Sequence, residues 1–94
     1  MSVLYAALKK RSLGPTVANH QVNGKTTLRW HVDNDDDRYV EAVDSLHSGA
    51  FVLHRRDGFD AIIAVIDDVS ATVRWIEVQL DFLGRQPSRG EVTT

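Results

Sequence analysis

Five acidic residues in the middle of the chain share the spacing of a calcium-binding loop. They occupy positions 1, 3, 5, 9 and 12 of such a loop, and carboxylate oxygens at this spacing can wrap one hard cation. The sixth position, where the sharp turn requires glycine, is Arg38. We therefore predict that the segment binds no metal and forms the acidic first turn of a helix, with calcium or another hard metal as the alternative. The five acids are Asp33, Asp35, Asp37, Glu41 and Asp44.

A histidine beside these acids raises the possibility of a second kind of chemistry. His31, Asp33 and Asp35 alternate along the chain, so in a continuous strand their side chains would lie on one face. Imidazole with carboxylates can bind a transition metal or transfer protons. His20 would lie diagonally across a hairpin from His31, but no ligand stands at a spacing that fixes a metal site. A solvated sheet face is the favoured interpretation.

The residue types that most enzymes need are absent or lack their usual context. The chain contains no cysteine, which excludes disulfides, thiolate metal sites and cysteine nucleophiles. Its serines do not stand in a nucleophile elbow, and its six glycines form no phosphate-binding loop. We predict no catalytic residue and no cofactor, and an enzyme is the least supported class of function.

Positive charge is concentrated in the first third of the chain. Residues 1–32 contain five lysines and arginines and no acid, whereas residues 33–68 contain ten acids and three arginines. Such a split can indicate an anionic partner, but segments of opposite charge can also attract each other within or between chains. Six residues are candidates to neutralise the phosphates of a nucleic acid or another polyanion: Lys9, Lys10, Arg11, Lys25, Arg29 and His31.

Helical spacing of apolar residues predicts two helices in the first half of the chain. From Val3 to Leu8 the apolar residues recur at this spacing, and Gly14 with Pro15 would end the helix. Residues 34–47 begin with acids and have one apolar side, which predicts a second helix that Gly49 closes.

Two dipeptides that contain glycine predict two β-hairpins. The first, Asn23-Gly24, is typical of a two-residue type I′ turn and would pair Val17 with Trp30. This register places Leu28 and Trp30 on one face, and on the other face His20, Lys25, Arg29 and His31.

The second dipeptide, Asp57-Gly58, predicts a type I′ turn within residues 51–66. Its register would pair Arg55 with Asp60. Because both faces of this segment are largely apolar, its strands are expected to be central and covered.

Residues 69–83 fit two kinds of secondary structure. Alternation from Ile76 to Phe82 is typical of a strand, but longer-range spacing, length and the acids before it favour a helix. Such a helix has two apolar rows on nearly opposite sides, of which one sheet covers only one, so a second subunit is expected to cover the other. The rows are Val69, Val73, Ile76, Leu80 and Leu83, and Ala71, Trp75, Val78 and Phe82.

These elements predict an α+β fold with an antiparallel four-stranded sheet from two hairpins and about three helices, in the order α-ββ-α-ββ-α. Residues 1–84 would form a single domain and residues 85–94 a disordered tail. The longest apolar run, residues 61–66, is too short to cross a bilayer. With the lack of cysteine, this suggests a cytoplasmic protein without membrane contact.

The expected function follows from the uncovered apolar row. We predict a small non-enzymatic protein-interaction module that acts as a homodimer or binds another protein, with Trp75, Val78 and Phe82 in the interface. The alternative is a protein that binds nucleic acid or an anionic ligand through its basic N-terminal third.

Overall fold

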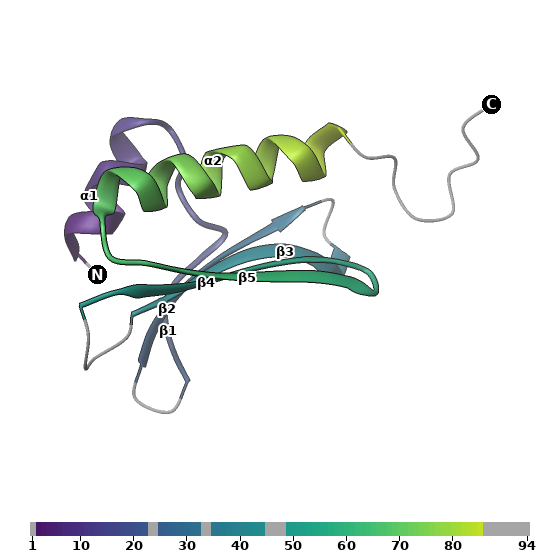
Figure 1. The fold of residues 1–94 in the computed structure, drawn as a ribbon, viewed down its shortest axis with the longest axis horizontal. Coiled ribbons are helices and arrows are strands. Elements are labelled where there is room, and N and C mark those ends of the chain that lie inside the picture. Colours follow the sequence, from purple (N-terminus) through teal and green to yellow (C-terminus); the bar gives the residue numbers. More distant parts are fainter. Residues whose placement is uncertain (1, 23–24, 33–34, 45–48, 86–94) are drawn as a thin grey trace.

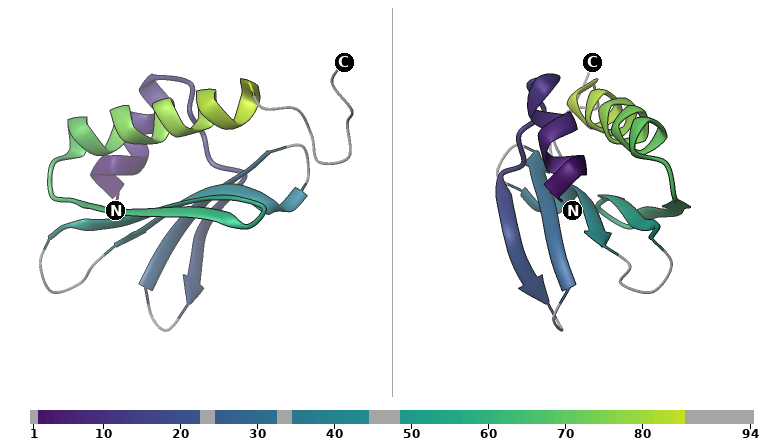
Figure 2. Two further views of the ribbon diagram at one scale, coloured as in Figure 1. Left: turned by 45° about the vertical axis from the view of Figure 1, so that its right-hand side comes forward. Right: turned by 90° about the vertical axis from the view of Figure 1, so that its left-hand side faces the viewer.

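The computed structural model describes residues 2–22, 25–32, 35–44 and 49–85. Five antiparallel strands form one sheet in which neighbours in sequence are neighbours in space, and both helices lie on the same face of it (Figures 1 and 2). The predicted α+β fold with an antiparallel sheet is confirmed. The elements are α1 (Ser2–Lys10), β1 (Val17–Val22), β2 (Lys25–Val32), β3 (Asp35–Asp44), β4 (Phe51–Asp57), β5 (Asp60–Ile66) and α2 (Val69–Arg85).

The predicted middle helix is wrong, because most of that segment forms strand β3 at the centre of the sheet. Along β3 the side chains alternate: Val40 and Ala42 are buried beneath the helices, whereas Glu41 lies on the opposite face. β3 pairs with β2 on one side and β4 on the other, so its backbone groups are satisfied by two ladders. This central position outweighs the helical spacing of the sequence. Within the described residues the order is therefore α-βββββ-α, with five strands instead of the predicted four and two helices instead of three.

The first hairpin follows the prediction near its turn and departs from it farther away. Val22 pairs with Lys25, as Asn23-Gly24 predicts, although the two turn residues lie outside the described part of the chain. A register shift then occurs between the pairs of Val17 and His20, so Val17 pairs with Arg29 and not with Trp30. An extra residue on one strand of this kind is a β-bulge, which local turn chemistry does not specify.

The second hairpin forms with a different turn from the one predicted. Its two central residues are Gly58 and Phe59, and Asp57 pairs with Asp60, so the register differs by two residues from the predicted one. Gly58 has a φ of 65° and Phe59 has no positive φ, a combination typical of a type II′ turn. Because the shift is two residues, every side chain keeps its predicted face.

The two helices begin and end at residues with identifiable roles. α2 confirms the helical interpretation of residues 69–83, and Asp68 caps it, as its Oδ2 accepts a hydrogen bond from the backbone N–H of Ala71 at 2.8 Å. α1 ends at Lys10, and the chain turns away from the helix at Ser12, which has a φ of 60°, and not at Gly14. The tail predicted for residues 85–94 lies outside the described residues except for Arg85, which is the last residue of α2.

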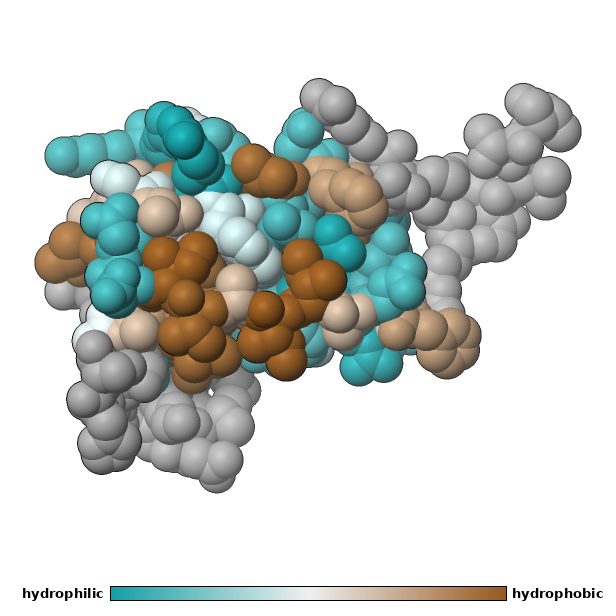
Figure 3. All heavy atoms as spheres, in the orientation of Figure 1, coloured by the Kyte–Doolittle hydropathy of each residue, from teal (hydrophilic) through white to brown (hydrophobic). Residues whose placement is uncertain are grey.

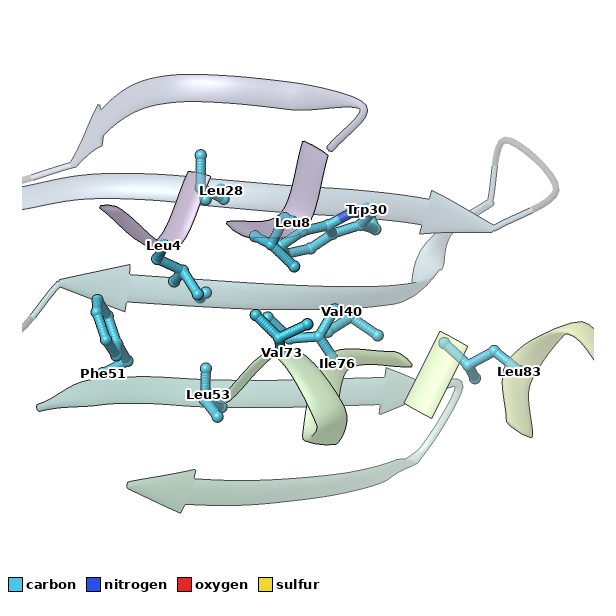
Figure 4. Packing of buried hydrophobic residues seen from close by; sticks show 11 residues of the cluster. Leu4, Leu8, Leu28, Trp30, Val40, Phe51, Leu53, Val73, Ile76 and Leu83 are labelled. Carbon is cyan, nitrogen blue, oxygen red and sulfur yellow. The ribbon is translucent and has the colours of Figure 1, made fainter. Parts of the chain in front are cut away.

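The hydrophobic core is centred on the three middle strands. Figure 4 shows its labelled side chains extending from β2, β3, β4 and the two helices, and none from β1 or β5. From β5, only Ala64 and Ile66 pack against the core, and they do so partly buried. β5 is an edge strand, so the expectation that both strands of the second hairpin are central and covered is wrong for this strand. The central position in the sheet is taken by β3, the segment that was predicted to form the middle helix.

Candidate interaction surface

The three residues predicted to form an interface lie on α2, but their environments differ. Val78 is 54% exposed and points away from the core. Trp75 is partly buried and packs against the core of its own chain. The ring of Phe82 is partly exposed and lies 4.3 Å from the guanidinium carbon of Arg55 on β4. Val78 and Phe82 are therefore available to a partner, whereas Trp75 already contributes to the fold.

Strand β5 carries exposed apolar side chains that sequence reasoning missed. Ile63 is 71% exposed and Val65 is 65% exposed, and Ile62 on the other face of the strand is also exposed. The strand contains one charged residue, Asp60 at its start. The lack of charge after Asp60 is visible in the sequence, but the same pattern is typical of a central strand.

The exposed apolar residues of β5 lie on both faces of the sheet at its edge, and α2 adds two more. We call them together the β5/α2 surface: Ile62, Ile63, Val65, Val78 and Phe82. The two parts are joined through β4, since Ile62 pairs with Arg55 and the Arg55 guanidinium lies beneath the Phe82 ring. Figure 3 shows hydrophobic residues gathered along β5 below α2 in this view. Exposed apolar residues grouped in this way are uncommon on a monomer and make this region the candidate interaction surface.

The six candidate anion-binding residues do not form one surface. Lys9 and Lys10 are exposed at the end of α1, followed by Arg11, in the helical layer. Arg29 and His31 lie on the sheet face opposite the helices, where the backbone pairing places them beside Glu41 and Tyr39. Lys25 is the first residue of β2, and its side chain lies outside the described part.

Two of these cations have acidic partners within the chain. The Arg11 Nη1 lies 3.4 Å from a Glu77 carboxylate oxygen on α2. The Arg29 Nε donates to the Glu41 carboxylate at 2.8 Å, and its guanidinium carbon lies 4.5 Å from the centre of the Tyr39 ring. The opposite charges of the sequence are thus partly used inside the molecule, which is the alternative explanation of the charge asymmetry.

The sheet face opposite the helices carries an aromatic group around Tyr39. His54 meets its ring edge-on at 5.5 Å, and His31 lies tilted at 6.2 Å from it. The Tyr39 side chain is almost completely buried by these rings and by Arg29. Its ring face is therefore not available for stacking on a base without rearrangement.

No family model matches this chain, and neither the curated proteins nor the solved structures contain a significant match. Its function must therefore be inferred from its own surfaces.

The acidic segment is not shaped as a cation-binding loop. Residues 35–44 form the extended strand β3, so from Asp36 to Asp44 successive side chains point to opposite faces and do not converge. Asp33, the first residue of the predicted spacing and a member of the trio with His31, lies outside the described residues. Among the described residues, no three histidine or acidic side chains are grouped closely enough to hold a metal ion.

A hollow of about 890 Å³ lies where α1 meets the start of α2. Lys10 and Arg11 line it from α1, and Trp75 and Val78 line it from α2. Its walls are mixed in polarity, and Ile66 and Val78 are also among the residues that line it. Neither helix in the described part of the chain has the length and apolar character needed to cross a bilayer.

Proposed function

We propose that this protein is a small non-enzymatic protein-interaction module that acts as a homodimer through the β5/α2 surface. The observation that carries the proposal is the exposure of apolar side chains on edge strand β5 and on the neighbouring helix α2. Water contact with such side chains is unfavourable by roughly 25 cal/mol for each Å² of apolar area. A second copy with the same surface can cover them by a two-fold arrangement.

The alternative, binding of a nucleic acid or another polyanion, has weaker support. The basic residues that would contact phosphates lie partly in the helical layer and partly on the opposite sheet face. Arg11 and Arg29 also face acids of their own chain. A polyanion would have to displace these partners and contact two faces at once.

The proposal predicts that charge on the β5/α2 surface separates the dimer without unfolding the chain. The double variant Ile63→Lys/Val78→Glu changes two exposed side chains, so each subunit should keep its circular dichroism spectrum. Sedimentation at micromolar concentration should show a dimer for the unmodified protein and a monomer for the variant.

The matched control is Val3→Glu, which changes an exposed valine of α1 that is not part of the β5/α2 surface. This variant should remain a dimer. A monomeric unmodified protein at every concentration would refute the proposal, as would a dimer that the double variant leaves intact.

A further inference from the structure

Strand β5 is an edge strand without the features that usually prevent edges from pairing. Within the described residues it pairs only with β4. The register is regular from the pair of Asp57 with Asp60 to the pair of Phe51 with Ile66. Its seven residues include no lysine, no proline and no bulge. Natural sheets commonly protect an exposed edge with one of these features, because unpaired backbone groups are a template for another strand.

The opposite edge of the same sheet is protected. Strand β1 has the polar sequence Ala-Asn-His-Gln between its two valines. Its pairing with β2 also contains a register shift between Val17 and His20, which interrupts a regular edge. The contrast between the two edges indicates that the regular, apolar edge of β5 has a partner.

The apolar side chains of β5 lie on both faces of the sheet. Ile62 shares a face with Arg55 and the helices, whereas Ile63 and Val65 share the other face with His54 and Val52. A globular partner docked on one face would leave the other face exposed to water. A strand added beside β5 would cover both, because its side chains also alternate between faces.

The free backbone groups of β5 follow from its hairpin with β4. Asp57 and Asp60 flank a two-residue turn, where the flanking residues bond to each other. Alternate residues then bond to β4, so the N–H and C=O groups that point to the open edge belong to Ala61, Ile63 and Val65.

We propose that the homodimer forms by antiparallel pairing of β5 with β5 of a second copy, centred on Ile63, so that the two sheets join into one. This inference rests on the proposed function, since it specifies the strand and register of the same interface. Centring on Ile63, the middle residue of Asp60–Ile66, lets the whole strand pair.

The strand is complementary to itself in this register. Ile63 opposes Ile63 of the partner subunit, and Ala61 opposes Val65 of the partner subunit, so the residues with free backbone groups meet and can exchange both hydrogen bonds. Ile62 opposes Ala64 of the partner subunit on the helical face. Every one of these pairs is apolar, and Val78 and Phe82 on the adjacent helix would be covered along the same two-fold axis.

A cysteine introduced at the centre of this contact should form a disulfide between the subunits. Opposed residues of a hydrogen-bonded pair have Cα atoms about 5.5 Å apart, which is within the range of roughly 4.4 to 6.8 Å that a disulfide spans. The natural chain has no cysteine, so Ile63→Cys provides a unique thiol. Mild oxidation should convert most of this variant to a covalent dimer on a non-reducing gel.

Phe59→Cys is the control, because Phe59 is 97% exposed at the turn but does not approach its counterpart in the proposed pairing. In each strand Phe59 lies four residues from Ile63. At about 3.4 Å per residue, Phe59 and its counterpart are therefore roughly 25 Å apart. Its cross-linked fraction should be at least tenfold smaller. Equal cross-linking of both variants would show random collision and overturn the edge pairing.

Proline at the same position provides a second, independent test. Ile63→Pro removes an N–H that does not bond to β4, which an edge strand tolerates, and it should weaken dimerisation at least tenfold. Ile63→Thr keeps the N–H and the β-branched shape and should remain more strongly dimeric.

The outcomes separate this inference from the proposed function. A dimer in sedimentation that neither cross-links at Ile63 nor weakens with proline would overturn the strand pairing alone, and the homodimer would stand. A monomer in sedimentation would overturn both. If the proline variant fails to fold by circular dichroism, the comparison of the two cysteine variants decides.

Discussion

At the scale of single residues, Arg38 attaches the end of α2 to the sheet. Its side chain is fully buried, and its Nη2 donates to the backbone oxygen of Leu83 at 2.6 Å. Its Nε lies 3.2 Å from an Asp57 carboxylate oxygen at the end of β4. One guanidinium thus satisfies a carbonyl at the helix C-terminus and an acid beside the second hairpin, which only its forked set of donors allows.

Arg38→Ala is expected to destabilise the fold more than any other removal of an ion pair described here. Breaking a buried pair costs about 3 to 5 kcal/mol, and we expect about 2 to 3 kcal/mol because Asp57 retains contact with water. Urea denaturation measures the change. Arg11→Ala, which removes the exposed pair with Glu77, should cost less than about 1 kcal/mol. Similar losses for the two variants would contradict the assigned role of Arg38.

Gly58 is the residue that the turn of the second hairpin requires. Its φ of 65° is strained for a residue with a side chain, and its N–H donates to the backbone oxygen of Asp37 at 2.9 Å. Gly58→Ala should lower the free energy of unfolding by about 1 to 3 kcal/mol, the cost of holding a residue with a side chain at this positive φ. A thermal melt that is unchanged by this substitution would exclude the type II′ turn.

At the scale of elements, α1 ends in a backbone motif that sequence reasoning placed two residues too late. The N–H of Leu13 donates to the oxygen of Leu8 at 2.9 Å, and that of Ser12 donates to the oxygen of Lys9 at 3.1 Å. These are the two bonds of a Schellman motif, in which glycine is preferred at the position that Ser12 occupies. The loop that follows is held to the sheet by Trp30, whose Nε1 donates to the Leu13 oxygen at 3.0 Å.

Ser12→Gly should therefore stabilise the protein. Glycine relieves the strain of the 60° φ but loses more entropy on folding, which leaves a gain of about 0.5 to 1 kcal/mol. The corresponding rise in melting temperature is about 2 to 8 °C for a domain of this size. Gly14→Ala tests the competing assignment of the helix end, and it should not destabilise the protein, since a Cβ at Gly14 meets no atom within 4 Å. A loss of stability in Ser12→Gly would disprove this account of the cap.

At the scale of the whole molecule, the distribution of charge separates the two proposed kinds of partner. Exposed acids flank β5 at both ends, Asp60 at its start and Asp67 and Asp68 after it. In an antiparallel dimer each end of one strand lies near the opposite end of the other, so acids of the two subunits approach each other at the rim. This repulsion is screened by salt, whereas the apolar contact between them is not weakened by it.

Raising the sodium chloride concentration from about 0.1 to about 1 M should therefore leave the dimer intact or strengthen it slightly. Sedimentation at both concentrations measures the dissociation constant. Binding of a polyanion to the basic N-terminal third would weaken steeply over the same range, because added salt lowers the free energy gained when counterions are released from the polyanion. An association that falls severalfold at high salt would contradict an apolar contact.

The sequence by itself determined the elements whose signal is local. Helical periodicity located α1 and α2, the acids Asp67 and Asp68 marked the start of α2, and the glycines near residues 24 and 58 located two hairpins. It also placed Leu28 and Trp30 on one face of β2, which the structure buries, since strand alternation depends on neighbouring residues alone. The turn type, a bulge in β1 and a register shift of two residues were not determined, because they depend on how whole strands pair.

Only the tertiary structure decided the secondary structure of residues 35–44 and the position of β5 in the sheet. The segment from Asp35 has apolar residues that suit a helix or a strand, and pairing with strands on both sides selects the strand. That choice places β3 in the centre and moves β5 to an edge, where its apolar side chains become exposed. The candidate surface thus combines Val78 and Phe82, which helical periodicity identified, with Ile62, Ile63 and Val65, which look like core residues in the sequence. Burial depends on neighbours that are distant in the chain, so no local pattern distinguishes an apolar strand in the core from one at an exposed edge.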